Sequence, residues 1–63
     1  MNFVLDKTRK KKTLKRPDRS LTIHKTSHDN KYHIMYDSKE LEYWMSTPAG
    51  DGGFVLYPMK MEN

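Results

Sequence analysis

Apolar and polar residues alternate along the second half of the chain, which is the pattern of β-strands with one buried face. In residues 20–26, the side chains of Leu21, Ile23 and Lys25 fall on one side of an extended chain. Residues 31–37 repeat the alternation, and the Ser-His-Asp-Asn segment between the two runs is rich in turn-forming residues. Two alternating runs joined by a short polar turn predict a β-hairpin.

Residues 38–46 fit two structures. Asp37 followed by Glu40 matches a helix capping box, and Leu41 and Trp44 match the stripe of an amphipathic helix. Such a helix would have only about two and a half turns before the next proline, which is short for independent stability. The adjacent tyrosine and tryptophan favour a strand. We therefore expect a strand, with a short helix at 38–46 as the main alternative.

A loop and a final strand complete the predicted sheet. The glycine-rich segment 47–53 lacks the Gly-Lys-Ser/Thr sequence of a phosphate-binding loop, so we interpret it as a flexible hairpin loop. Residues 54–57 form the last strand, and Pro58 should end it or confine it to an edge of the sheet because proline has no backbone N–H. The sequence thus predicts an all-β domain at 20–60, a three- to four-stranded antiparallel meander compatible with a barrel-like closure, followed by a tail at 61–63.

Both faces of this sheet carry apolar residues, whereas a sheet with one solvated face carries them on one side only. To the first face we assign Ile34, Leu41, Tyr43, Phe54 and Leu56. To the second face we assign Met35, Trp44, Val55 and Tyr57, with Met59 as a further candidate. That second face needs a cover, which barrel closure, the N-terminal segment or a partner would supply. Most aromatic side chains of so small a sheet should form its core, and the candidates for stacking on bases or contacting a partner are Trp44, Tyr57, Met35 and His33.

Residues 1–19 form a basic N-terminal segment of a different kind. Residues 6–19 show neither strand nor helix periodicity, and like charges spaced four apart disfavour a helix, so we expect an extended or irregular structure. The Phe-Val-Leu triplet within residues 2–5 is compatible with a short strand. If that strand pairs with the sheet, the basic residues belong to a loop held at both ends and not to a free arm.

Positive charge is concentrated in this segment. Eight of the twelve Lys and Arg residues lie there, namely Lys7, Arg9, Lys10, Lys11, Lys12, Lys15, Arg16 and Arg19. Residues 1–20 hold eight cationic and two acidic side chains, a net +6, while residues 21–63 hold four cationic and six acidic ones, a net −2. Such a cluster neutralises phosphates with little sequence preference, so we expect a nucleic-acid partner, DNA or RNA. An acidic protein surface and a merely solvated segment are the alternatives.

Other functions find little support in the composition. The chain of 63 residues has no cysteine and no apolar run of membrane-spanning length, and its first charges follow the apolar start. We therefore expect an intracellular protein, in the cytoplasm, nucleoid or nucleus, without a membrane partner. The three histidines, His24, His28 and His33, match no standard zinc spacing, and we expect no metal, no cofactor and no catalytic site.

Two functions remain. The first is a small, non-enzymatic nucleic-acid-binding protein that places its basic segment on phosphates and part of an aromatic sheet face on the nucleic acid. The second is a small protein-binding regulator or inhibitor, in the style of phage or mobile-element products. It would act through its sheet face or edge together with the basic segment, and a homodimer is compatible with it.

Overall fold

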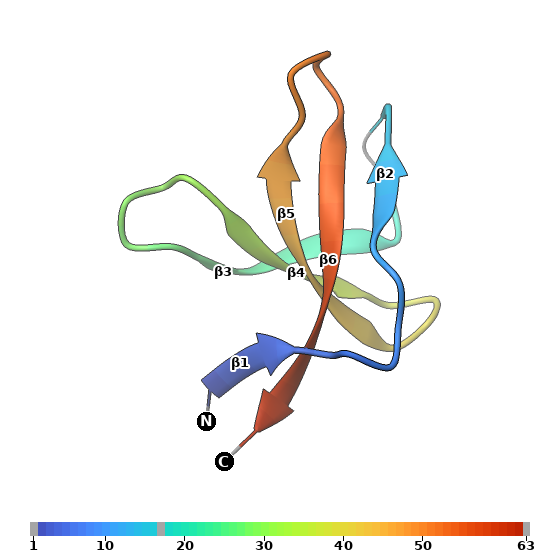
Figure 1. Ribbon diagram of the computed structural model, residues 1–63, viewed down its shortest axis with the longest axis vertical. Coiled ribbons are helices and arrows are strands. Elements are labelled where there is room, and N and C mark those ends of the chain that lie inside the picture. The colour runs from blue at the N-terminus through green and yellow to red at the C-terminus, as the bar shows by residue number, and fades with distance from the viewer. Residues whose placement is uncertain (1, 17, 63) are drawn as a thin grey trace.

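Six antiparallel strands form one sheet in the computed structural model, which describes residues 2–16 and 18–62 (Figure 1). The strands are β1 (Asn2–Leu5), β2 (Lys12–Leu14), β3 (Leu21–Thr26), β4 (His33–Asp37), β5 (Glu42–Pro48) and β6 (Phe54–Glu62). Their order is β1-β6-β5-β4-β3, and β2 also pairs with β6. The all-β prediction is confirmed, but the sheet has six strands instead of three or four, and it is not closed into a barrel.

The helical alternative for residues 38–46 is wrong, and the described residues contain no helix. Asp37 does act as a cap, since its Oδ1 accepts the N–H groups of Lys39 at 2.9 Å and Glu40 at 3.2 Å. Those groups belong to the turn between β4 and β5. Leu41 then takes a φ of 56°, a left-handed conformation that a right-handed helix does not contain. Asp37 is therefore a cap, as the sequence indicated, but it caps a tight turn and not a helix.

Strand β6 continues through Pro58 and lies inside the sheet, contrary to the prediction. It pairs with β5 on one side and with β1 and β2 on the other. The Pro58 carbonyl accepts the N–H of Asp6 at 2.9 Å, so the missing Pro58 N–H faces the point where the chain leaves β1. The Asp6 carbonyl, which would accept that N–H in a regular ladder, instead accepts the N–H of Arg9 at 3.4 Å. Proline is tolerated because its absent donor falls between β1 and β2.

The basic segment is fastened to the sheet at two places. Strand β1 pairs with residues 59–62 of β6, and β2 pairs with residues 54–56 of the same strand. The expected strand at 2–5 is thus present, and the residues that follow it form a loop held at both ends (Figure 1). The strand at 12–14 was not predicted, because three residues are too few to show alternation within a run of lysines.

The register divides the side chains between two faces. One side, here called the tryptophan face, carries Met35, Trp44, Ser46, Leu56 and Pro58. The other side, the groove face, carries Ile34, Tyr43, Met45, Tyr57 and Met59. The predicted faces are therefore wrong for β6, whose Leu56 lies with Trp44 and whose Tyr57 lies with Ile34. A difference of one residue in register reverses every side chain of a strand.

The sheet curls so that its two ends approach each other on the groove face. The Phe3 ring of β1 lies 5.6 Å from the His24 ring of β3 and 5.0 Å from the Tyr43 ring, measured between centroids. A β-bulge between Ile23 and Lys25 interrupts β3 at His24. Because of the bulge, Lys25 lies opposite Ile34 on the groove face and does not share a face with Ile23, as the strict alternation had predicted.

Candidate nucleic-acid interface

Arg9 directs its guanidinium into the fold. Its Nε pairs with Oδ2 of Asp6 at 3.0 Å, and its Nη1 pairs with Oε2 of Glu42 at 2.6 Å. Its Nη2 donates to the carbonyls of Tyr43 at 2.8 Å and Met59 at 2.6 Å. A planar guanidinium can make such a set of directed bonds, whereas an ammonium cannot. Arg9 therefore fastens the loop after β1 to β5 and β6 instead of presenting its charge to a phosphate.

Trp44 lies in the core beneath two cations of the basic segment. Only 5% of the residue is exposed. The Arg9 Cζ lies 4.7 Å from the centroid of the tryptophan ring, and the Lys12 Nζ lies 4.5 Å from it. The indole N–H is buried and has no hydrogen-bond partner among the described residues. The structure therefore places this candidate stacking residue under the basic segment, where its ring is closed to a base.

The other basic side chains of the segment reach solvent. Exposed positions are Lys7, Lys10, Lys11, Lys15, Arg16 and Arg19. Within residues 2–16 and 18–62, both salt bridges involve Arg9, so none of these six side chains is neutralised by one. The first three lie in the loop between β1 and β2, and the last three follow β2, so these two β6-paired strands anchor the stretch that carries them. We call these six residues the basic surface.

The remaining sequence candidates are divided between the two faces. Met35 is half-buried on the tryptophan face, where it lines a cavity of about 90 Å³. His33 is half-buried, and its Nδ1 lies 3.0 Å from the Thr26 hydroxyl oxygen. Tyr57 lies on the groove face, and the Lys11 Nζ lies 5.9 Å from the centroid of its ring. Of the four candidate stacking or partner residues, only Tyr57 is joined to the basic surface by such a contact among the described residues.

Two carboxylates organise the backbone of the basic segment. Hydrogen bonds from the Thr8 hydroxyl and N–H lower the pKa of Asp6 to about 2, and Arg9 contributes further lowering. The N–H and hydroxyl of Ser20 lower the pKa of Asp18. Both acids are ionised at neutral pH, so they hold the turns before and after β2 and offset part of the surrounding positive charge.

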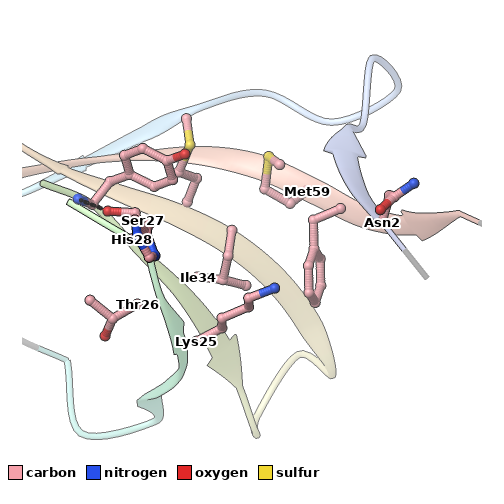
Figure 2. Close-up of a pocket in the computed structure, with 10 residues that line it drawn as sticks. Asn2, Lys25, Thr26, Ser27, His28, Ile34 and Met59 are labelled. Atoms are coloured by element: carbon pink, nitrogen blue, oxygen red, sulfur yellow. Dashed lines mark hydrogen bonds between the residues drawn. The ribbon is translucent and has the colours of Figure 1, made fainter. Parts of the chain in front are cut away.

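A groove that the sequence did not reveal opens on the groove face between β1 and β3 (Figure 2). Its volume is about 480 Å³, and Ile34, Met45 and Met59 belong to its apolar lining. Figure 2 shows the Lys25 ammonium pointing into the space between β3 and β1, with His28 on the β3 side. Strict alternation along β3 would place Lys25 on the same face as Ile23. Nothing in the sequence marks the bulge that turns its side chain to the groove face.

The histidines do not converge. His24 contacts the rings of Phe3 and Tyr43, whereas His28 lines the groove. Among residues 2–16 and 18–62, no group of three or more histidine or acidic side chains is placed to hold a metal ion. No helix in the described part of the chain has the length and apolarity needed to cross a membrane.

Comparison with known proteins gives no match to a protein-family model, to a curated protein or to a solved structure. The two features of the described residues that bear on function are the basic surface and the groove.

Proposed function

We propose that this protein binds nucleic acid, without catalysis, by placing its basic surface on the phosphate backbone. The observation that carries the proposal is the display of six exposed cations, unpaired by salt bridges within the described residues, on a segment that β1 and β2 fasten to β6. Cations on a fixed backbone lose less conformational freedom on binding than cations on a free arm. Thr13 is exposed beside them and adds a hydroxyl donor of the kind that positions a phosphate.

The makeup of the basic surface favours nucleic acid over an acidic protein. Stable protein interfaces contain a well-packed apolar centre, with charged residues at the rim. The strong hydrophobe of residues 6–19, Leu14, is half-buried and lines a small cavity with Leu21 and Leu56. The basic surface therefore offers charge without an apolar centre, which suits a polyanion.

A salt titration tests this proposal. If about four of the six cations contact phosphates on duplex DNA, the logarithm of the association constant should fall with the logarithm of salt concentration at a slope of about −3.6. Fluorescence anisotropy with labelled duplex and single-stranded oligonucleotides measures that slope. The absence of binding in the micromolar range at about 50 mM salt would contradict the proposal, since non-specific binding of this kind strengthens steeply at low salt.

Matched charge reversals separate the contribution of the basic surface to affinity from the contribution of the net charge. The double variant Lys10→Glu/Lys15→Glu should abolish most of the affinity and reduce the salt slope by about 2. The control Lys39→Glu/Lys60→Glu changes the net charge by the same amount at exposed positions outside the basic segment. The control should retain both the slope and most of the affinity, and equal losses in the two variants would show that only the total charge matters.

A second candidate, protein binding at a sheet edge, is favoured by strand β3. This strand lies at one end of the strand order, and Ile23 on it is 60% exposed. Edge strands bind extended peptides through backbone hydrogen bonds, although the bulge beside Lys25 is also a feature that discourages such pairing. Partners that survive nuclease treatment and are lost in the variant Ile23→Lys would support this candidate. Partners that vanish with nuclease would support the first.

A further inference from the structure

The groove and the basic surface are connected by a row of side chains that crosses the sheet. The register places Lys25 of β3 opposite Ile34, Ile34 opposite Met45, and Met45 opposite Tyr57 of β6. At the far end, the Lys11 ammonium lies 5.9 Å from the centroid of the Tyr57 ring. Neighbouring strands lie about 4.8 Å apart, so the row from β3 to the segment beyond β6 spans about 19 Å. It has a cation at each end and apolar or aromatic side chains between them.

The groove has room for a planar group over the β3 side of this row. Its volume of about 480 Å³ lies within the range of about 300 to 1,000 Å³ seen for small-ligand sites. Tyr32 also lines the groove and is 41% exposed, so its ring is accessible to a ligand. Lys25 and His28 add an ammonium and an imidazole to the same lining. The contact of Phe3 with His24 joins the groove walls, β1 and β3, without pairing the strands.

We propose that the groove accepts an unpaired base of a single-stranded nucleic acid, whose backbone then runs across the groove face from Lys25 to Lys11. This inference rests on the proposed function and deepens it, because it makes single strands the preferred class. Anionic phosphates meet the cations at the two ends of the row, and planar bases meet the apolar and tyrosine side chains between them. A duplex keeps its bases stacked and paired, and so cannot present a base to the groove.

Three probes of equal length separate base recognition from phosphate binding. They are a labelled oligothymidylate of about 12 nucleotides, within the site sizes of small single-strand-binding folds, its duplex with oligoadenylate, and an abasic backbone. The oligothymidylate should bind at least about fivefold more tightly than the abasic strand, since stacking one base contributes a factor of this size or more. Equal affinity for all three probes would overturn the groove proposal while leaving phosphate binding intact. No binding of any probe would contradict the proposed function itself.

Two exposed groove residues supply variants that should still fold. Tyr32→Ala should weaken oligothymidylate binding by about fivefold or more and leave the abasic strand unaffected. Lys25→Ala should reduce the salt slope on single strands by about 0.7. The matched control Lys39→Ala removes the same charge from the turn between β4 and β5 and should leave that slope unchanged. Emission from the buried Trp44 verifies the fold of each variant.

The methionines locate the bound strand directly. Met45 and Met59 line the groove, whereas Met35 lies on the opposite face. With ¹³C-labelled methionine methyl groups, oligothymidylate should shift the Met45 and Met59 resonances and leave that of Met35 in place. Shifts confined to backbone amides of the basic surface, with both groove methyls unmoved, would overturn the proposal.

Discussion

The two faces of this sheet carry similar apolar side chains and differ in what covers them. On the tryptophan face, the basic segment lies over the core, with Arg9 and Lys12 placed 4.7 and 4.5 Å from the Trp44 ring centroid. On the groove face, Ile34 and Met45 line an open space of about 480 Å³. One apolar surface is thus closed by the chain itself, and the other is open between β1 and β3.

Neighbouring cations of the basic segment have two different roles, covering the core or facing solvent. Long cationic side chains can cover apolar surface with their aliphatic stems and interact with an aromatic ring through their charge. Arg9 and Lys12 are used in this way, while Lys10 and Lys11 between them are exposed. A count of positive charges therefore overstates the number available to a partner. A cation whose side chain faces the sheet covers the tryptophan face, and one whose side chain faces away is available to a partner.

Removal of the Arg9 side chain should uncover the tryptophan face and produce the largest loss of stability. Arg9→Ala breaks two ion pairs and two hydrogen bonds to carbonyls in a partly buried setting. We expect a loss of about 3 kcal/mol in the free energy of unfolding, which lowers the melting temperature of a domain this small by roughly 10 °C or more. Thermal denaturation measures the loss, and Trp44 emission should move to longer wavelength.

The neighbouring exposed lysine is the control for that experiment. Lys10→Ala should change the stability by less than about 0.5 kcal/mol, as surface substitutions usually do. If the two variants unfold at the same temperature, or if Trp44 emission in Arg9→Ala does not change, the basic segment is not the cover of the tryptophan face.

The contact of β2 with the glycine loop offers a second way to disturb only one face. A Cβ at Gly53 would lie 2.5 Å from the Leu14 carbonyl oxygen, closer than real Cβ contacts. Because backbone must move to relieve this clash, Gly53→Ala should cost about 2 kcal/mol and loosen β2 from β6. Hydrogen exchange should quicken across β2 and stay slow in β4. Gly50→Ala, where a Cβ meets nothing within 4 Å, should show neither change.

The sequence predicted the individual strands and turns better than it predicted which strands pair. Alternation found the β3–β4 hairpin, and the aromatic pair at Tyr43 correctly favoured a strand over a helix. Each of these patterns involves only a few neighbouring residues, so it can be recognised without knowledge of the fold. Asp37 also behaved as a cap, although the capped structure is a turn.

What the sequence could not show depends on contacts between distant residues. The pairing of β2 with β6 joins segments about forty residues apart, and the tolerance of Pro58 depends on where β1 ends. The bulge in β3 decides the face of Lys25, and so the chemistry of the groove. The basic cluster was visible as composition, but the inward turn of Arg9 required the position of Glu42.

The charge of Asp6 gives the smallest and most specific test of how the tryptophan face is covered. Hydrogen bonds from Thr8, with a further contribution from Arg9, hold the Asp6 pKa at about 2, below its ordinary value of 3.8. Because the pKa is lower in the folded protein, this carboxylate contributes its full stabilisation above about pH 4 and loses it as the pH falls toward 2. The Thr8 amide resonance should therefore titrate with a midpoint of about 2.

The variant Asp6→Asn separates this contribution from general acid effects. Its stability should fall below that of the parent at neutral pH, and the difference should shrink through the same window between pH 3.8 and about 2. Lys10→Ala should follow the parent curve in parallel, since its side chain is exposed and joins neither described salt bridge. A Thr8 midpoint near 3.8 would mean that the loop after β1 does not hold this geometry in solution. Arg9 would then be free to leave Trp44, and the distinction between a covered and an open face would fail.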